Sequence, residues 1–350
     1  MSQASPWWDP HSFEDRRPFL DQRGRLVGAM RRFFEARGFT EVDTAMLQVS
    51  PGNETHIGAF ETTLVSPDGA KSRLYLHTSP EFAAKKLLAA GLPLLFTLAH
   101  VFRNGERSAL HHPEFTMLEW YRAEATYEKL FDDCAELLAV AGEAAGTNFF
   151  RFRGNTADIT KRPEILTVCD AFARYADIDL AATLDDAADG RAALATAAGR
   201  LGLRVVADDT WSDLFSKILS AKVEPSLGQS RPTLLVDYPA REAALARLKR
   251  DRRFAERFEL YVCGVELANG FGELTDAAEQ RRRFEAAMTE RARIYGDAYP
   301  IDEDFLAAVA AMPPACGIAL GFDRLVMLAS GADRIEQVIW SPVALAGTSR

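Results

Sequence analysis

Hydrophobic residues recur along the chain with two different periods. Near the N-terminus, four apolar positions in an arginine-rich stretch follow the spacing of one helix face, and the stretch ends at Gly38, a residue favoured just after helix C-termini. The four positions are Leu26, Met30, Phe33 and Phe34. We therefore predict an amphipathic helix of about three turns before Gly38, followed by an extended segment over residues 39–42.

A strand-loop-strand unit is predicted farther along. Thr78 to Glu81 is typical of a helix start, the run from Leu94 to Phe102 is apolar, and residues 103–113 form a polar loop. Glu114 to Arg122 then alternates with period two, so every second residue would share one face. That face would line a pocket wall together with Arg103, although a lone hairpin with solvated charges is the alternative. Its members are Phe115, Met117, Glu119 and Tyr121.

Helical patterning replaces strand patterning between about residues 131 and 227, and we interpret this stretch as an inserted helical subdomain. We divide the chain into an N-terminal extension (1–18) and one catalytic domain (19–345) that carries the insertion. Strand-like segments return at Thr233–Tyr238, Phe258–Glu266 and Gly317–Gly321, the last running into a helix from Asp323.

The charge and the cysteines narrow the class of protein. The 350 residues include 41 Lys and Arg against 50 Asp and Glu, a net charge of −9 with a pI near 5.3. Nucleic-acid binding depends on neutralising phosphates, so this balance disfavours it and favours a basic protein partner. The four cysteines show neither paired spacing nor a CxxC unit, and no targeting or membrane-spanning segment is evident. We expect a cytoplasmic protein with no membrane partner.

Two glutamates suggest a metal site. A hairpin turn symmetric about Val262 and Cys263 would place Glu259 directly across from Glu266. Facing carboxylates destabilise a sheet unless a cation lies between them, and Mg²⁺ is commonly held by carboxylates together with phosphates. Two exposed glutamates on solvent-facing strands are the alternative.

Two further segments have ligand-binding character. Residues 267–273 carry two glycines around Phe271, with Asn269 and Glu273 beside them, and either a close approach of ligand to backbone or an ordinary glycine-rich turn would explain them. In residues 317–321 small residues alternate on one strand face before a helix opens. Arg324 in that helix adds a positive charge next to amide donors, which suits a phosphate.

Together these segments resemble the three signature motifs of class II aminoacyl-tRNA synthetases, most closely those of the lysyl branch. The first motif corresponds to residues 31–47, the second to 102–121 and the third to 317–328. The resemblance implies an α+β fold, with an antiparallel β-sheet flanked by helices, and a homodimer formed through the first motif. Lysyl enzymes carry an anticodon-binding barrel ahead of that motif, and the stretch before Arg31 leaves no room for such a domain.

A lysyl-type chain without the barrel is similar to the ligases that attach lysine or β-lysine to a lysine side chain of elongation factor P. Ala319 fits that branch, because lysyl synthetases have glycine there. The resemblance implies an ATP-dependent, AMP-forming ligase that uses ATP and Mg²⁺, with elongation factor P rather than tRNA as its partner.

The resemblance also implies roles for individual residues. Arg103 would hold the α-phosphate and Arg324 the terminal phosphates as the catalytic groups, with Glu259 and Glu266 on the magnesium. The other ATP-contacting positions are Asn104, Gly105, Glu106, His112, Phe115 against the adenine, Leu267 and Gly321. The positions of the amino-acid pocket are Ser79, Pro80, Glu81, Tyr121, Asn269, Glu273 and Ala319, with Tyr121 and Glu273 at the ammonium end.

Three residues depart from the family pattern. Gly105 stands where the family usually has glutamate, with Glu106 next to it; His112 replaces asparagine, and Ala45 replaces a proline. The first two concern the nucleotide contacts, and the third concerns dimer packing.

Other functions are compatible with the same fold. A lysyl synthetase acting on tRNA is disfavoured by the missing barrel and the acidic charge, and an asparagine synthetase by the lysyl form of residues 266–273. A nonenzymatic regulator would be expected to have lost a phosphate-binding arginine or an opposed carboxylate, and all four of these side chains are present.

Overall fold

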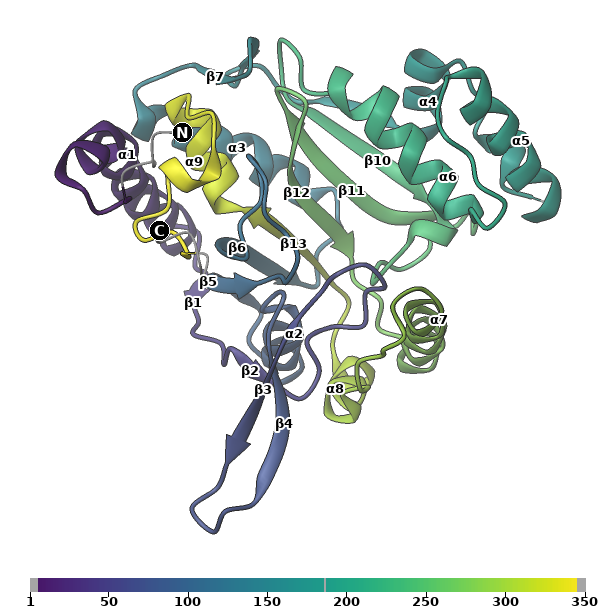
Figure 1. Cartoon of the computed structure of the whole chain (residues 1–350), viewed down its shortest axis with the longest axis horizontal. Helices are drawn as coiled ribbons and strands as arrows, with labels where there is room; N and C mark the ends of the chain where they lie inside the picture. The colour runs from purple at the N-terminus through teal and green to yellow at the C-terminus, as the bar shows by residue number, and fades with distance from the viewer. Residues whose placement is uncertain (1–5, 186, 345–350) are drawn as a thin grey trace.

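The computed structural model of the chain describes residues 6–185 and 187–344. Its centre is an eight-stranded sheet with the strand order β1-β5-β6-β13-β12-β11-β10-β9 (Figure 1). Only the two outermost pairs are parallel, so the predicted α+β class with an antiparallel sheet flanked by helices is confirmed. The strands are β1 (Thr40–Glu41), β5 (Leu94–Phe102), β6 (Glu114–Ala123), β9 (Glu164–Thr167), β10 (Thr233–Pro239), β11 (Phe254–Val262), β12 (Val265–Gly272) and β13 (Ala315–Gly321).

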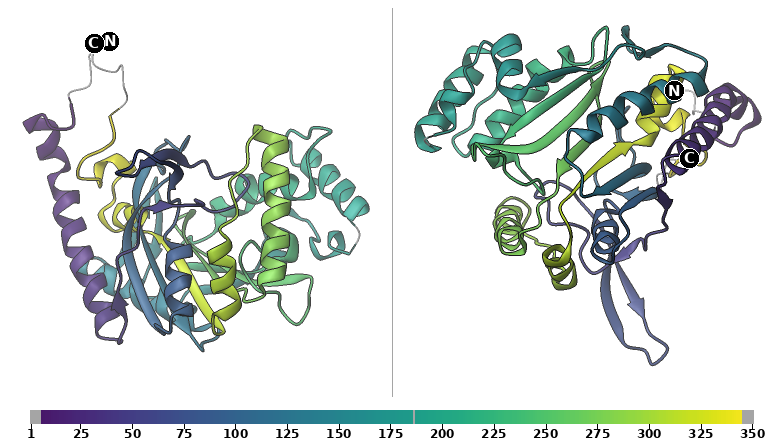
Figure 2. Two further views of the ribbon diagram at one scale, coloured as in Figure 1. Left: turned by 90° about the horizontal axis from the view of Figure 1, so that it is seen from below. Right: turned by 180° about the vertical axis from the view of Figure 1, so that it is seen from behind.

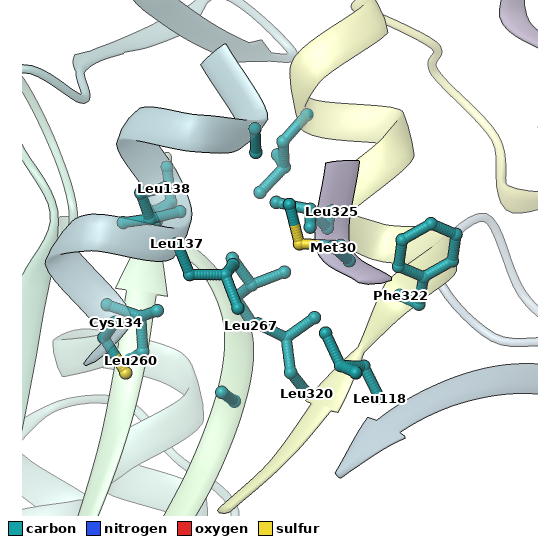
Figure 3. Packing of buried hydrophobic residues seen from close by; sticks show 14 of the residues in the cluster. Met30, Leu118, Cys134, Leu137, Leu138, Leu260, Leu267, Leu320, Phe322 and Leu325 are labelled. Atoms are coloured by element: carbon teal, nitrogen blue, oxygen red, sulfur yellow. The ribbon is translucent and has the colours of Figure 1, made fainter. Parts of the chain in front are cut away.

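The two faces of the sheet have different roles, because successive residues of a strand point to opposite sides. On one face, Leu118 and Trp120 of β6 join Ile318 and Leu320 of β13 in the main apolar core. Three helices cover that face: α1 (Pro10–Glu35), α3 (Lys129–Ala145) and α9 (Phe322–Ser330). Figure 3 shows side chains of these helices, such as Met30, Leu137 and Leu325, packed against Leu118, Leu267 and Leu320 of the strands.

Helices α2 (Glu81–Ala89), α7 (Ala277–Tyr295) and α8 (Glu303–Ala311) lie together on the other side, as Figures 1 and 2 show. Phe82 of α2 stacks on Phe305 of α8 with 3.8 Å between ring centroids, and Phe284 of α7 joins them. Farther along α2, Ala84 and Leu88 pack with side chains of β5 and β6. These contacts fix α2 beside the sheet face that faces away from the main core.

Helix α1 is longer than predicted. It has 26 residues rather than about three turns, begins where Asp9 accepts hydrogen bonds from the amides of His11 and Ser12, and runs across residue 18, where we set the end of the N-terminal extension. Its first half is mostly exposed and lacks an apolar stripe, which is why the hydrophobic pattern missed it. Gly38 adopts a left-handed φ of 79° after the helix, as its position predicts.

The predicted strand-loop-strand unit is confirmed, since β5 and β6 pair from Leu94 opposite Arg122 to Phe102 opposite Glu114. The segment at 267–273 is not a glycine-rich turn, because most of it belongs to β12 in the sheet interior. The helix after residue 81 is confirmed as α2, and the strand leading into a helix near residue 322 as β13 and α9.

The stretch from 131 to 227 is less uniformly helical than predicted. Its first helix, α3, packs in the main core, and a hairpin and strand β9 follow before the helical part begins. That part has its own apolar cluster against β10 and β11. It consists of α4 (Val168–Ala176), η1 (Ala181–Thr183), α5 (Ala187–Arg200), α6 (Trp211–Ile218), η2 (Leu219–Val223) and η3 (Glu224–Ser226).

Two small sheets complete the structure. The hairpin of β3 and β4 projects away from the body, as Figures 1 and 2 show. The remaining elements are β2 (Leu47–Gln48), β3 (Phe60–Val65), β4 (Lys71–Leu76), β7 (Phe149–Phe152), β8 (Asn155–Asp158), η4 (Ala240–Glu242) and η5 (Ile335–Gln337). Within the described ranges, we find no helix with both the length and the apolar character needed to span a bilayer.

Candidate active site

A cavity of about 1400 Å³ lies over the sheet face opposite the main core. Its floor includes Phe115 and Met117 of β6, Asn269 of β12 and Ala319 of β13. Helices α2 and α7, the loop over residues 51–57 and residues 207–213 of the helical part form its walls. Single-ligand pockets typically measure about 300–1,000 Å³, so this cavity has room for a nucleotide and a second small molecule.

Arg103 enters the cavity from the end of β5. Its Nε donates to the carbonyl oxygen of Thr78 at 3.3 Å, and its guanidinium carbon lies 5.4 Å from the centroid of the Phe115 ring. Among residues 6–185 and 187–344, no carboxylate lies within ion-pair distance of this guanidinium. Arg103 is therefore a fixed cation beside an aromatic face, and its charge is available to an anionic ligand.

Arg324 is held from three directions in the first turn of α9. Its Nη1 donates to the carbonyl oxygen of Glu266 at 2.7 Å and its Nε to that of Leu110 at 3.3 Å. Its Nη2 lies 2.8 Å from Nε2 of His111, whose pKa is lowered by burial and by the Arg324 charge, so the neutral ring accepts this hydrogen bond. The Glu266 carboxylate is farther away, at 3.7 Å. A preorganised guanidinium at a helix N-terminus is a favourable site for phosphate.

His112 has both ring nitrogens engaged. Nδ1 lies 2.6 Å from the carbonyl oxygen of Glu114, so it donates, and Nε2 accepts a hydrogen bond from the amide of Val343 at 3.2 Å. The side chain is buried and its tautomer is fixed. Histidine at this position thus ties the motif loop to the C-terminal segment.

The backbone conformation at position 105 accounts for glycine there, where the family usually has glutamate. It has a φ of 84°, in the left-handed region that glycine tolerates, and the preceding Asn104 donates its backbone amide to the carbonyl oxygen of Gly58 at 2.7 Å. Asn104 and Gly105 line a separate hollow, whereas the next residue, Glu106, lines the main cavity. Of these three residues, only Glu106 brings a side chain to the main cavity.

A carboxylate cluster occupies the α2 end of the cavity. The Ser79 hydroxyl donates to Oε1 of Glu119 at 2.5 Å and the Tyr121 hydroxyl to Oε2 at 2.8 Å. Burial, followed by the charge of Glu81, raises the pKa of Glu119 to about 8. Burial therefore favours the protonated form of Glu119, and the nearby Glu81 carboxylate favours it further.

Glu273 completes the cluster just beyond β12. Its Oε2 lies 2.7 Å from Nζ of Lys85, and burial raises its pKa to about 7. A Cβ atom on Gly317 would lie 2.3 Å from the Tyr121 ring and 2.5 Å from Oε1 of Glu273. Glycine on β13 therefore lets Tyr121 and Glu273 approach each other.

Asn269 and Ala319 pair across β12 and β13 beside this cluster. The Oδ1 atom of Asn269 is buried without a hydrogen-bond partner in the described part of the protein. An orphaned acceptor on the floor of a cavity is expected to accept from a ligand, since leaving it unpaired costs free energy. The Ala319 methyl group lies next to it and narrows the floor.

The predicted opposition of Glu259 and Glu266 is wrong. The turn residues are Cys263 and Gly264, with φ values of 57° and 76°, so Val262 pairs with Val265. The register shifts after Leu260, and Asn269 then stands opposite Glu259.

Glu259 has intramolecular partners and does not line the cavity. Its Oε2 accepts from the hydroxyls of Tyr238 and Tyr261 at 2.5 and 2.6 Å, and its Oε1 from Arg257 at 2.6 Å. Glu266 does line the cavity, and burial followed by the nearby charge of Glu259 raises its pKa. The two carboxylates thus interact electrostatically without facing each other.

Nearly the whole chain matches one known protein family. A family model of class II tRNA synthetases of the D, K and N type matches residues 9–344. The chain belongs to this family.

Several relatives of this class II synthetase chain carry the name "Elongation factor P--(R)-beta-lysine ligase". The Proteus mirabilis protein is 39% identical over 349 residues, which cover 98% of this chain and 99% of the relative. The Edwardsiella ictaluri protein is 41% identical over 325 residues, covering 91% and 93%. The Salmonella dublin protein is 39% identical over 344 residues, covering 97% and 98%.

In this class II synthetase domain, most of the predicted site residues line one cavity. They are Ser79, Glu81, Arg103, Glu106, His112, Phe115, Glu266, Leu267, Asn269, Ala319, Gly321 and Arg324. Tyr121 and Glu273 connect to this set through Glu119 and Lys85, while Pro80 is the residue that precedes α2.

Our sequence reasoning did not assign Lys85 or His111 to the site, and it placed Glu119 on the pocket wall without giving it a role in binding. Lys85 follows Glu81 by four residues, the spacing of an ion pair on one helix face, and this signal was available. His111 gave no comparable signal, because its role depends on where Arg324 lies in the fold.

Proposed function

We propose that the protein is an ATP-dependent ligase that activates β-lysine or lysine as an adenylate and transfers it to a lysine side chain of elongation factor P. One observation carries the proposal: Arg103, Arg324 and Glu81 line one cavity, and the buried carboxylates of Glu119 and Glu273 are linked to its wall through Ser79 and Lys85. The arginine end suits a triphosphate and the carboxylate end suits a diamino acid. The names of the relatives support the same substrate and acceptor.

The amino-acid end supports a substrate with two ammonium groups. In the described ranges, Lys85 is the only cation that forms an ion pair with Glu81 or Glu273, and Glu119 forms none. Three carboxylates facing one cation leave two negative charges uncompensated when all are ionised. Burial is the main cause of the raised pKa values of Glu119 and Glu273, about 8 and about 7, and the charge of Glu81 adds to both. A diamino acid would supply both missing charges.

In the first step, a carboxylate oxygen of the amino acid attacks the α-phosphorus of ATP, and pyrophosphate leaves. Arg103 would neutralise the α-phosphate and Arg324 the terminal phosphates, while Phe115 stacks on the adenine. Both guanidinium groups are held before the ligand arrives, so little reorganisation is needed in the transition state.

Glu266 is suited to hold Mg²⁺, because its carboxylate lines the cavity and its nearest cation, Arg324, is 3.7 Å away. Glu259 already accepts three hydrogen bonds, so its Oε1 retains one lone pair for a metal or a metal-bound water. When bound, Mg²⁺ would neutralise phosphate charge.

In the second step, the acceptor amine attacks the adenylate carbonyl carbon, an amide bond forms, and the bond to the phosphate oxygen breaks to release AMP. The attacking amine must lose a proton, and we infer that the adenylate phosphate accepts it. Arg103 would orient that phosphate. Transfer that is unimpaired when Arg103 is replaced would contradict this arrangement.

The decisive experiment measures the mass of intact elongation factor P after incubation with the protein, ATP, Mg²⁺ and β-lysine. We expect a gain equal to one lysyl residue that requires ATP, with a smaller yield from lysine. Parallel reactions contain tRNA in place of the protein acceptor. Charged tRNA with an unchanged acceptor mass would contradict the proposal and favour the synthetase function.

Two further proposals concern the assembly and the compartment. We expect a homodimer through the first motif, and the exposed apolar side chains of Met46, Leu47 and Val49 beside it support this. Light scattering after size-exclusion chromatography tests it. The four cysteines are free thiols, which is typical of a reducing compartment and supports a cytoplasmic location.

A further inference from the structure

Lys85 is a buried lysine in the middle of the carboxylate cluster. It lies one turn after Glu81 on α2, and its side chain is 1% exposed. Its Nζ lies 2.5 Å from Oε1 of Glu81 and 2.7 Å from Oε2 of Glu273. Burial alone would lower the pKa of Lys85, but the charges of Glu273 and Glu81 outweigh it and raise the pKa. The lysine is therefore a permanent cation.

Glu273 depends on Lys85 for its charge. In the described part of the chain neither of its oxygens has another hydrogen-bond donor, and the side chain is 1% exposed. Arg247 is the next nearest cation, but it is paired with Glu256 at 2.6 Å. A buried carboxylate that lost its only close cation would take up a proton instead.

The groups around Lys85 come from every neighbouring element. Helix α2 contributes Glu81, β6 contributes Glu119 and Tyr121, and the end of β12 contributes Glu273. Cys316 of β13 is a neutral thiol because burial, and then the Glu273 charge, raises its pKa to about 12. Among the described residues, Lys85 is thus the single cation paired with this ring of acidic or neutral groups.

We propose that Lys85 is a positioning residue that sets the charge selectivity of the amino-acid pocket. It holds Glu81 and Glu273 ionised and fixed in place, so that the ammonium groups of the ligand supply the remaining positive charge. This inference rests on the proposed function and extends it to a residue that contacts no reacting atom. It implies that an amino acid of similar shape without the second ammonium, such as norleucine, is rejected.

The test compares Lys85→Met with Lys85→Arg and with Lys86→Met. Lys86 is the matched control, because it follows Lys85 on the same helix but is partly exposed and pairs with Asp302 and Asp304, away from the carboxylate cluster. The readouts are KM and kcat for β-lysine in ATP–pyrophosphate exchange from about pH 6.5 to about pH 9, KM for ATP, and the ratio of kcat/KM for β-lysine and norleucine.

We expect Lys85→Met to raise KM for β-lysine at least about tenfold near pH 7 and to leave KM for ATP unchanged. The loss should shrink as pH rises, because the protonated carboxyl then ionises, and the selectivity over norleucine should fall near neutral pH. Lys85→Arg should retain the wild-type pH profile, and Lys86→Met should retain wild-type kinetics.

Three results would overturn the inference. They are an unchanged or lower KM in Lys85→Met, a loss of equal size at every pH, or unchanged selectivity over norleucine. If Lys85→Met does not fold, the double variant Lys85→Met/Glu81→Gln removes the uncompensated charge and is measured instead. It should show reduced selectivity over norleucine, and wild-type selectivity would overturn the inference. Absence of exchange with any diamino acid in the wild-type protein would instead contradict the proposed function.

Discussion

Arg23 on α1 and Asp323 on α9 form a buried ion pair that joins the helix leading into the first motif to the third motif. Asp323 also accepts from the backbone amide of Thr116 on β6 at 2.7 Å, and Arg23 donates to the Thr116 hydroxyl at 2.7 Å. Helix α1 and the second and third motifs, which lie far apart in the sequence, therefore meet in one hydrogen-bonded network. Asp323 immediately precedes Arg324, for which we propose phosphate binding, so this network also positions that arginine.

Replacing Asp323 by Ala should destabilise the protein by about 3–5 kcal/mol, because the Arg23 guanidinium would remain buried without its partner. Denaturant unfolding measures the loss. Asp21→Ala is the control: Asp21 pairs with Arg17 at the surface of the same helix, and its loss should cost less than about 1 kcal/mol. Equal effects of the two variants would contradict the role of the buried network.

Replacing Arg324 by Lys should lower kcat for ATP–pyrophosphate exchange by at least about a hundredfold. A lysine keeps the charge but cannot contact Leu110, Glu266 and His111 together, so the phosphate would meet a mobile cation. Arg107→Lys serves as control, since Arg107 is half-exposed and pairs with Glu336. Near wild-type exchange by Arg324→Lys would show that the charge alone is sufficient.

The stability of the protein should depend on Glu119. Its pKa is raised from 4.5 to about 8, so between these values the folded state holds a proton that the unfolded state has lost. The free energy of unfolding therefore falls as pH rises through this range. In Glu119→Gln this slope should become less negative by up to about 1.4 kcal/mol per pH unit, the value for one proton.

Chemical denaturation at several pH values measures that slope. Glu114→Gln on the same strand is the control, because Glu114 is exposed and should leave the slope unchanged. An identical pH dependence in wild type and Glu119→Gln would rule out a retained proton at Glu119.

Gly317→Ala should weaken amino-acid binding and destabilise the fold by about 1–3 kcal/mol, because the added methyl group would overlap the Tyr121 ring and Glu273. KM for β-lysine and thermal unfolding are the measurements. At Gly24 in α1 a Cβ meets no atom within 4 Å, so Gly24→Ala should be neutral or slightly stabilising. Unchanged KM in Gly317→Ala would show that Tyr121 and Glu273 can move apart without affecting the pocket.

The strands that carry the site could be predicted because apolar residues recur regularly along them. In β6, Phe115 and Met117 line the cavity while Leu118 and Trp120 lie in the core, and β5 before it is apolar except at Thr97 and His100. The resemblance to class II synthetases added the order of these segments, and most of the residues that it implied line one cavity.

The register of the β11–β12 hairpin was not predictable by the same means. Its two turn residues both have positive φ, and the usual sequence signal for such a turn is Asn-Gly or Asp-Gly. Here the first turn residue is Cys263, which carries no such signal. The register shift next to Leu260 then changes the partner of Glu259, and no hydrophobic pattern records it.

Successive residues of β13 point to opposite faces of the sheet, so neighbouring residues have different roles. Point substitutions at Ala319 can therefore alter what the enzyme accepts while Ile318 and Leu320 keep the molecule folded. Deletion of one residue earlier in β13 would turn Ile318 and Leu320 toward the cavity and Ala319 toward the core. Bulky side chains would then occupy the proposed substrate site. We expect relatives to diverge here by replacement, and not by insertion or deletion.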